Sequence, residues 1–283
     1  MTDTTKKTIL NNEQYSTIVE YIQNYRGLAI DCELDLEQRF PDIHRQTLKS
    51  IVVTEMGLRT KINFSNYQAN AERFLRIFEQ KSSRSFDNNI LVDMASSERM
   101  SPVILSRVIL QEKYKDLQKS DIAELMKKPH LIEDEKLAGN VRQCTLSDNQ
   151  EGPVVDIRRR CLGEEYEVKL KKMATDAKMA YFDENDLRRT GFDKTPDLKL
   201  VLPCLYKGCV VNWIESKALF GDAKTHRRYL YSQLSSYSNR FGPGIVIYWF
   251  GYHEEIVHLK ENGAGLIILA DFPSLEHLEF LNT

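Results

Sequence analysis

The sequence predicts a mixed protein of class α+β or α/β, with a helical N-terminal region followed by a C-terminal mixed-sheet domain. Over the first half of the chain, apolar residues recur at helical spacing in segments that short polar links separate. Beyond about residue 150, β-type apolar runs alternate with helical segments. The polar stretch SDNQEGP (147–153) contains a Gly-Pro break between these two textures. We therefore expect domains at residues 1–149 and 150–283.

Composition is that of an ordinary globular protein. Of the 283 residues, 42% are hydrophobic and 28% are charged. No apolar run approaches the roughly 20 residues that span a bilayer, and the N-terminal stretch MTDTTKKTILNNEQ lacks the apolar core of a signal peptide. We therefore expect an intracellular protein without a membrane partner. The formal charge of −2 means that any affinity for nucleic acid must come from local basic patches.

The cysteines do not suggest a metal or redox site. The chain has 5 cysteines, which are scattered and form no C-x-x-C pair. A zinc knuckle or a redox motif would need such a pair. We expect reduced thiols that pack as small hydrophobic side chains.

The N-terminal region contains a first candidate helix-turn-helix unit. Apolar spacing predicts helices at 13–25 and 44–56, with a short helix at 33–40 between them, and a further helix at 64–80. This spacing alone does not separate a DNA-binding unit from a plain helical bundle. In the DNA-binding case, the candidate phosphate contacts are His44, Arg45 and Lys49.

A second candidate unit spans residues 89–114. One helix is predicted to end at Ala95, and Ser101 is a good N-cap for the next helix, with Pro102 at its first position. The apolar residues of that next helix form a core face and are expected to leave Ser106 and Arg107 pointing outward. Arg107 is therefore the candidate phosphate contact of this unit, and a helical bundle without a ligand is the alternative.

The C-terminal domain is predicted to begin with a helix at about 155–178. Its β-type runs are LKLVLPCLY (198–206), CVVNWIESK (209–217), IVIYWF (245–250) and LIILADF (266–272). A second helix at about 224–240 lies between the second and third runs. Lys207-Gly208 is a turn signal, so the first two runs form a hairpin.

One end of this hairpin carries charges that an apolar sheet does not need. Glu215 and Lys217 share a face because strand side chains alternate, and pairing back from the turn brings Asp197 opposite them. Charges on a buried sheet are costly unless they are paired or bound to metal. A structural ion pair satisfies this condition. A site for a hard cation such as Mg²⁺ satisfies it too, with Lys217 orienting or deprotonating water or stabilising the phosphoryl transition state.

Two neighbouring helices offer further candidates. Glu167 lies at the edge of the buried face of the first helix, where it could reach the hairpin end, and Glu165 is its rival. On the second helix, His226, Arg227 and Arg228 could line a substrate groove or form a solvated face. Arg240, in the stretch NRFGPG, could add a phosphate contact, although Gly-Pro-Gly is first of all a helix stop.

Several motifs together resemble a known nuclease superfamily. Thr195-Pro196-Asp197 followed by Glu215-Ser216-Lys217 resembles the PD-(D/E)xK signature in its order and hairpin context. Gln233-x-x-x-Tyr237 resembles the Q-x-x-x-Y motif of the following helix, and Glu167 the acid of the preceding helix. The stretches DKTPD (193–197), WIESKALFGD (213–222) and YSNRFGPGIVIYWFG (237–251) are similar to the codanin-interacting nuclease family, as are the two helix-turn-helix units.

The resemblance implies a restriction-endonuclease-like mixed sheet that hydrolyses phosphodiester bonds with Mg²⁺ or Mn²⁺. Asp197 and Glu215 would be metal ligands, with Glu167 a direct or outer ligand and the Ser216 carbonyl an additional one. Lys217 would be the catalytic base or water-orienting group. Gln233 would position substrate or metal-bound water, and Tyr237 would pack or contact phosphate.

The resemblance also implies partners and a location. It favours structured DNA over RNA as the nucleic acid, a codanin-like protein as the partner, and the nucleus, with the cytoplasm left open. Other readings of the same residues are a catalytically silent nuclease-fold adaptor and a helix-turn-helix regulator with an α/β ligand domain. Intact Asp197, Glu215 and Lys217 argue against the adaptor, and the regulator leaves the E-x-K and Q-x-x-x-Y placement unexplained.

Overall fold

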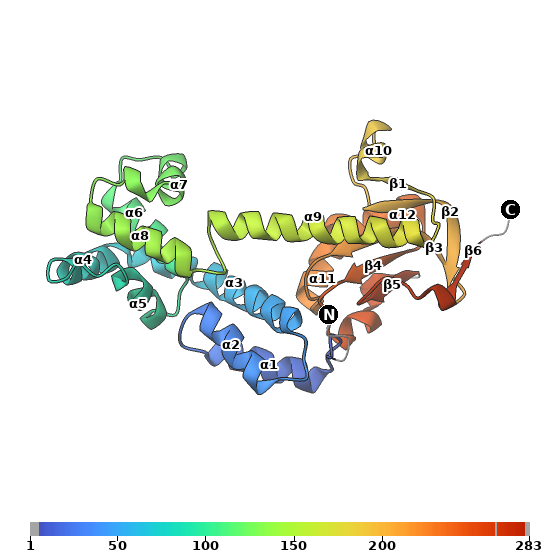
Figure 1. Ribbon diagram of the computed structural model, residues 1–283, viewed down its shortest axis with the longest axis horizontal. Helices are drawn as coiled ribbons and strands as arrows, with labels where there is room; N and C mark the ends of the chain where they lie inside the picture. Colours follow the sequence, from blue (N-terminus) through green and yellow to red (C-terminus); the bar gives the residue numbers. More distant parts are fainter. Residues whose placement is uncertain (1–5, 264, 281–283) are drawn as a thin grey trace. The chain divides into compact units, whose positions relative to one another are not determined.

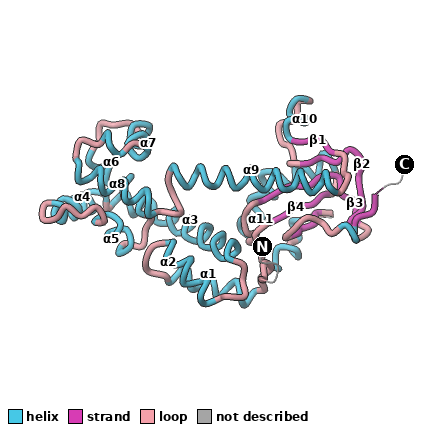
Figure 2. The backbone as a smooth tube through the Cα atoms, in the orientation of Figure 1, coloured by secondary structure: helices cyan, strands magenta, loops and turns pink. Residues whose placement is uncertain are grey.

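The computed structural model describes residues 6–263 and 265–280, and it has the predicted mixed α+β architecture (Figures 1 and 2). Helices dominate the first half of the described chain, and a six-stranded mixed sheet dominates the second. None of the described helices combines the length and the apolar character that a membrane span requires.

The chain forms two compact units that are discontinuous in sequence. Unit 1 comprises Met1–Thr17, Pro41–Ser50 and Cys161–Thr283, and unit 2 comprises Ile18–Phe40 and Ile51–Arg160. The expected boundary at 149/150 does fall in a loop, between two helices. The compact units nevertheless divide elsewhere, because two N-terminal segments belong with the C-terminal sheet.

The N-terminal helices follow the predicted order, but the helix predicted at 64–80 begins only at Ala71, and the helices at 119–127 and 135–147 were not predicted. The predicted break after residue 56 does not exist, because a single helix continues through Gly57 and ends only at Ala69. Gly57 has open space around it, and one glycine inside a helix costs only about 1 kcal/mol relative to alanine. The helices are α1 (Asn12–Asn24), α2 (Ala29–Arg39), α3 (Arg45–Ala69), α4 (Ala71–Ser82), α5 (Ile90–Ser97), α6 (Pro102–Lys113), α7 (Lys119–Lys127) and α8 (Glu135–Ser147).

Helix α6 is the core of unit 2. It begins as predicted, with the Ser101 hydroxyl accepting from the Ile104 amide at 3.1 Å and Pro102 in the first turn. From Pro102 to Leu110 every residue is buried except Arg107, which is half-buried. A recognition helix must expose a face to enter the major groove. The second helix-turn-helix prediction is therefore wrong in its function for α6: the turn is present, but its second helix is a core helix.

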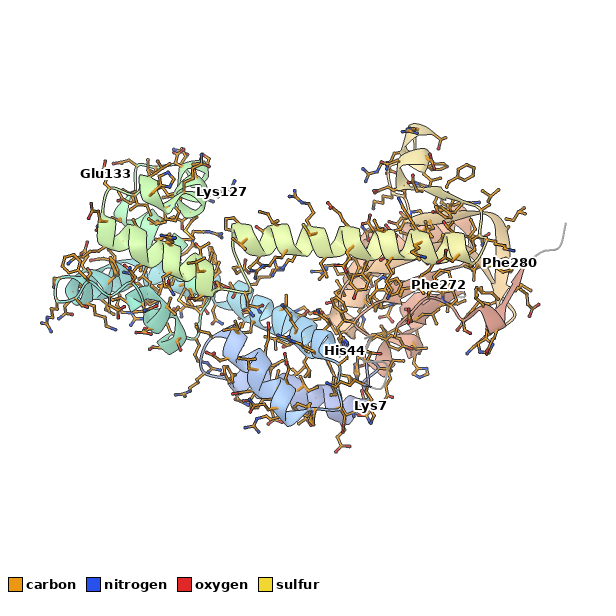
Figure 3. The ribbon with its side chains drawn as sticks, viewed as in Figure 1. Lys7, His44, Lys127, Glu133, Phe272 and Phe280 are labelled. Carbon is orange, nitrogen blue, oxygen red and sulfur yellow. The ribbon has the colours of Figure 1, made fainter. Side chains whose placement is uncertain are left out.

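The start of α3 belongs to unit 1. There the Thr47 hydroxyl donates to the Phe250 carbonyl at 2.7 Å, and the Ser50 hydroxyl accepts from the Phe220 amide at 2.7 Å. His44 precedes this helix (Figure 3) and is half-buried, as is Lys49, whereas Arg45 is exposed. The first turns of α3 are thus held by long-range packing on one side.

The sheet of unit 1 is mixed. Its order is β1-β2-β3-β4-β5, with β6 beside β2; pairs among β1, β2, β3 and β6 are antiparallel, and β3-β4 and β4-β5 are parallel. The expected strands lie where the apolar runs predict them. The strands are β1 (Tyr181–Asp183), β2 (Leu198–Tyr206), β3 (Cys209–Lys217), β4 (Gly244–Tyr248), β5 (Leu266–Leu269) and β6 (Leu278–Phe280).

Helices complete unit 1. A long helix, α9 (Pro153–Asp176), precedes β1, and its residues Leu170 and Ala174 are fully buried. Between β3 and β4 the chain forms α11 (Ala223–Tyr229), a π-helical turn (Leu230–Leu234) and α12 (Ser235–Phe241), where one helix was predicted. This segment covers one face of the sheet through a cluster of buried side chains. They are Trp213, Leu230, Leu234, Tyr237, Val246, Tyr248, Ile256 and Ile268.

The cysteines fit the expectation in part. All five are free. Cys32, Cys144 and Cys204 are buried as small hydrophobic side chains, but Cys161 and Cys209 are exposed.

Candidate active site

A bulge in the hairpin decides which residue faces Glu215. Next to the turn, Tyr206 pairs with Cys209 and Cys204 with Val211; at the far end, Lys199 pairs with Trp213 and Leu198 with Ile214. Between these two blocks β2 advances five residues, from 199 to 204, while β3 advances two, from 211 to 213. Pro203 lies in this irregular stretch, where a residue without an amide hydrogen is tolerated. The shifted register brings Asp197 beside Glu215.

The Glu215 carboxylate binds the backbone of Asp197, and the Asp197 carboxylate binds the backbone of Ser216. The Asp197 amide donates to Glu215 Oε2 at 3.2 Å, and the Ser216 amide donates to Asp197 Oδ2 at 2.6 Å. Glu215 is only 3% exposed and Asp197 is half-buried. The two carboxylates therefore converge at the end of the hairpin, as predicted, although it is the register shift in β2 that brings Asp197 opposite Glu215.

Lys217 completes the cluster. Its Nζ donates to Glu215 Oε1 at 2.5 Å and to Gln233 Oε1 at 2.9 Å. The same ammonium lies 4.6 Å from the ring centroid of Tyr229, a distance at which the ring face attracts a cation. Lys217 is thus held from three sides, by an acid, an amide and an aromatic ring, and its side chain is 13% exposed.

The electrostatics of the cluster are those of two close carboxylates and one ammonium. Burial and the nearby Glu215 carboxylate raise the pKa of Asp197 well above its usual range, against the lowering effect of the Ser216 amide. Burial disfavours the charged form of Lys217, but the Glu215 carboxylate outweighs it, so the pKa of Lys217 is raised. At neutral pH, Lys217 is therefore an ammonium in this structure.

The π-helical turn sets the direction of Gln233. Leu230–Leu234 is wound with i→i+5 geometry between two α-helical segments, and Gln233 lies inside it. Such turns are rare and occur often at functional sites. The extra residue rotates Gln233 relative to a regular helix, so its side chain meets Lys217 while Leu230 and Leu234 stay in the core.

Of the two candidate acids on α9, Glu167 is the one whose charge interacts with the cluster. Burial first, then nearby charges that include Glu184 and Glu215, raise the pKa of Glu167, and Glu167 in turn acts on Asp197. The charge of Glu165 instead acts on Tyr166, whose pKa it helps to raise. Glu167 is nevertheless exposed, and no three acidic, histidine or cysteine side chains of the described residues are grouped closely enough to hold one ion. In this conformation Glu167 occupies an outer position.

Tyr237 and Arg240 have structural contacts. Tyr237 is 2% exposed and packs edge-on against Trp213, with ring centroids 5.5 Å apart. Arg240 donates to the Lys194 carbonyl at 3.0 Å and pairs with Asp193 at 3.1 Å. Arg240 thus anchors the segment that leads into Thr195-Pro196-Asp197.

The three basic residues near the end of α11 differ in their exposure to solvent. His226 is fully buried and is bonded on both ring nitrogens, to the Tyr248 hydroxyl at 2.7 Å and to Asn262 Oδ1 at 2.8 Å. The expectation that it lines a groove is wrong, because it has no exposed surface. Arg227 pairs with Glu261 at 3.0 Å, whereas Arg228 is exposed.

Sequence reasoning missed three supporting residues. Tyr229 lies against Lys217, and the Trp249 indole donates to the Ser216 hydroxyl at 2.7 Å, between the two charged residues of β3. Thr195 is 7% exposed, and its hydroxyl has no partner among the described residues. Only Thr195 carried a signal, through its place in the Thr-Pro-Asp motif.

The chain is similar to known proteins. A family model described as "Protein of unknown function TPD sequence-motif" matches residues 133–272, which include Thr195-Pro196-Asp197. Among curated proteins, CDAN1-interacting nuclease 1 of Xenopus laevis is 36% identical over 273 residues, which cover 93% of this chain and 88% of that protein. The protein of the same name from Homo sapiens is 35% identical, covering 94% and 96% of the two chains.

A more distant relative covers the chain equally well. CDAN1-interacting nuclease 1 of Gallus gallus is 31% identical, covering 94% of this chain and 95% of that protein. No solved structure matches the chain. Because the similarity extends over nearly the whole of both sequences, this chain belongs to the CDAN1-interacting nuclease 1 family.

Proposed function

We propose that this protein is a divalent-metal-dependent nuclease that hydrolyses phosphodiester bonds of nucleic acid. The observation that carries the proposal is the convergence of Asp197 and Glu215 beside a protonated Lys217 at the end of the hairpin. A purely structural ion pair needs one acid and one base. The second carboxylate raises the energy of the cluster, as the raised pKa of Asp197 indicates, so it has a use beyond stability.

The residues of the cluster fit Mg²⁺ or Mn²⁺. Asp197 and Glu215 supply hard oxygen ligands, and the Ser216 carbonyl is close in sequence; Mg²⁺ is commonly held by one or two carboxylates while it keeps several waters. The unpartnered Thr195 hydroxyl is a further polar group that a bound water could satisfy. When bound, such an ion supplies Lewis acidity and lowers the pKa of a coordinated water.

Lys217 acts in this proposal as a positive hydrogen-bond donor. With a raised pKa it holds its proton, so stabilising charge on phosphate oxygens suits it better than accepting a proton from water. Gln233 accepts from the ammonium and Tyr229 covers it, and together they fix its position. Pre-set groups of this kind lower the barrier because they need no reorganisation during the reaction.

The nucleic acid in this proposal is structured DNA, and a codanin-like protein is the partner. The relatives are named for a nuclease and for interaction with CDAN1, and we extend both properties to this chain. Arg228 is an exposed basic side chain suited to backbone contact. Such contacts position the nucleic acid without reading its sequence.

The test is cleavage of labelled branched, flapped and single-stranded DNA, with matching RNA, in Mg²⁺, Mn²⁺ or EDTA. Lys217→Ala is compared with Lys119→Ala, a matched loss of charge at an exposed position of unit 2. We expect cutting that needs metal, survives in Lys119→Ala and falls by at least about 100-fold in Lys217→Ala. Absence of cutting in all conditions would contradict the proposal.

An adaptor is the second candidate. In this structure the Glu215 carboxylate is satisfied by Lys217 and by the Asp197 amide, so the cluster needs no ion for its stability. For an adaptor, Lys217→Ala and the wild type would bind a codanin-like partner equally well and neither would cut nucleic acid.

A further inference from the structure

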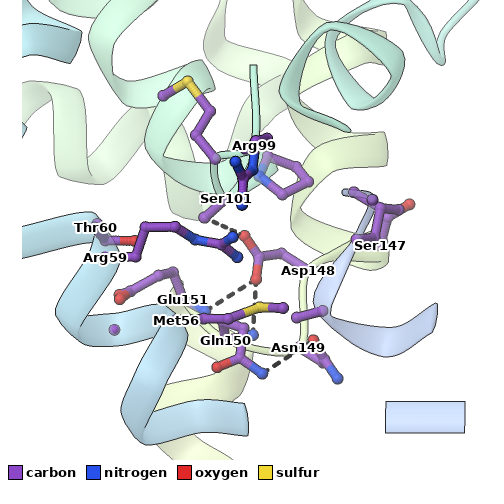
Figure 4. Close-up of a pocket in the computed structure, with 16 residues that line it drawn as sticks. Met56, Arg59, Thr60, Arg99, Ser101, Ser147, Asp148, Asn149, Gln150 and Glu151 are labelled. Carbon is purple, nitrogen blue, oxygen red and sulfur yellow. Dashed lines mark hydrogen bonds between the residues drawn. The ribbon is translucent and has the colours of Figure 1, made fainter. Parts of the chain in front are cut away.

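A small pocket in unit 2 is lined by two arginines. It lies where the α5–α6 turn, the middle of α3, residues 27–29 and the 147–151 loop meet (Figure 4). Its volume is about 30 Å³. That space holds one small polar group and is too small for a nucleotide base. Arg59, from α3, and Arg99, from the turn, both point into it.

Neither arginine has an acidic partner among the described residues. Arg59 donates to the Tyr25 carbonyl at 3.4 Å, and Arg99 donates to the Gln23 carbonyl. Burial first, and then the neighbouring Arg99 charge, lower the pKa of Arg59. Two guanidinium groups thus face one pocket with only neutral backbone carbonyls as partners, and an anion between them would lower the energy of both.

Two buried polar atoms of the pocket are unsatisfied. Arg99 Nε, a donor, and Gln150 Oε1, an acceptor, have no hydrogen-bond partner among the described residues. Gln150 is 5% exposed, and its amide nitrogen faces Glu33 and Asn149 oxygens, which fixes the direction of its carbonyl oxygen. Unsatisfied buried groups are rare in folded proteins and indicate a missing partner. The missing partner here has both acceptor and donor atoms.

The acidic residues of the pocket do not fill this role. The Asp148 carboxylate already accepts from the Ser101 hydroxyl and from the amides of Val103, Gln150 and Glu151. Burial raises the pKa of Glu151, with Arg159 opposing this. Glu151 also lines the pocket, where its carboxylate, when charged, repels an anion, so Glu151→Gln should strengthen anion binding.

A phosphomonoester has the chemistry that the pocket lacks. Its second pKa is about 6, so near neutral pH part of it carries one P–OH donor beside its acceptor oxygens. A carboxylate or an in-chain phosphodiester offers acceptors only. A terminal phosphate is attached to its strand through one ester bond, so it can enter a small recess. An in-chain phosphodiester is attached to the strand on both sides and cannot enter in this way.

We infer that this pocket binds the terminal phosphate of a nucleic-acid strand, with Arg59 and Arg99 donating to its oxygens and Gln150 Oε1 accepting a hydrogen bond from its P–OH group. The donor and acceptor groups of the pocket assign its ligand as a phosphomonoester. The nucleic-acid source rests on the proposed function, because hydrolysis of a phosphodiester leaves one phosphomonoester end at each cut.

The test measures binding, not cleavage, in EDTA with the full chain. Inorganic phosphate is titrated by calorimetry, and fluorescence anisotropy compares one labelled single strand carrying a 5′-phosphate, a 3′-phosphate or only hydroxyl ends. The variants are Arg59→Gln, Arg99→Lys, Glu151→Gln and the control Arg84→Gln, an exposed arginine of the same unit. A phosphoserine peptide forms the last arm.

We expect a phosphate end to bind at least about tenfold more tightly than a hydroxyl end, since hydrogen bonds to charged groups have that strength. Arg59→Gln should remove this advantage, Arg84→Gln should keep it, and Glu151→Gln should increase it. Equal affinity for phosphate and hydroxyl ends, or no response to Arg59→Gln and Glu151→Gln, would overturn the site. Tighter, Arg59-dependent binding of the phosphopeptide would overturn the nucleic-acid source. Because no cutting is involved, these results are independent of whether the cleavage test succeeds.

Discussion

Replacing Lys217 by methionine tests whether the cluster is as buried as the structure describes. Methionine keeps much of the length of lysine but removes the ammonium that pairs with Glu215 at 2.5 Å. The side chains of Lys217 and Glu215 are 13% and 4% exposed. The change therefore leaves a carboxylate in a nearly water-free place with its counter-charge gone.

The magnitude follows from what remains bonded to Glu215. Removing one partner of a buried ion pair costs about 3–5 kcal/mol, mainly because the other charge stays buried. Here the Asp197 amide still donates to Glu215 Oε2, so we expect the lower end, about 3 kcal/mol. Glu215→Gln should cost less, because Lys217 keeps Gln233 and the Tyr229 ring as partners.

The assay is urea unfolding in EDTA, followed by circular dichroism, for the wild type, Lys217→Met, Glu215→Gln and the double variant. The cycle isolates the interaction between the two residues, and we expect a coupling of about 1.5–3 kcal/mol. A loss of less than about 0.5 kcal/mol in Lys217→Met, the size of an exposed pair, would refute the buried geometry. It would also remove the basis for a pre-set ammonium in catalysis.

Three further predictions concern neighbouring groups. Asp197→Asn should abolish cleavage and yet raise the free energy of unfolding in EDTA at pH 7. Because the folded protein raises the pKa of Asp197, the protonated side chain stabilises the fold at low pH. This stabilisation is lost as the pH rises above the pKa that Asp197 has in the unfolded chain. For His226, burial lowers the pKa, so the folded protein holds it neutral. Stability should therefore fall as pH drops below about 6.5, the unfolded value, with a slope of at most about 1.4 kcal/mol per pH unit from this group, and His226→Gln should lose that slope in urea titrations. Tyr229→Phe keeps the ring over Lys217 and should keep cleavage, whereas Tyr229→Leu should lower kcat by about three- to tenfold with little change in KM, which steady-state kinetics would measure.

The sequence alone determined the local features of the site. Periodicity placed the hairpin and the neighbouring helices, because both depend on residues close in the chain. Strand alternation put Glu215 and Lys217 on one face, and helical spacing put Gln233 and Tyr237 one turn apart. The family resemblance, which the comparisons confirm, came from these same short motifs.

The tertiary structure decided which residues pair across the hairpin and which helix faces are buried. The shift of register in β2 brings Asp197 to Glu215, and the π-helical turn aims Gln233 at Lys217. The size of the register shift depends on how two separate strands pair, so the residues of β2 alone do not fix it. Burial is the second factor: α6 has a helix-turn-helix pattern but lies in the core, since α4, α5, α7 and α8 all pack against it. Local pattern states which face of an element is apolar, and only packing states how many of its faces are covered.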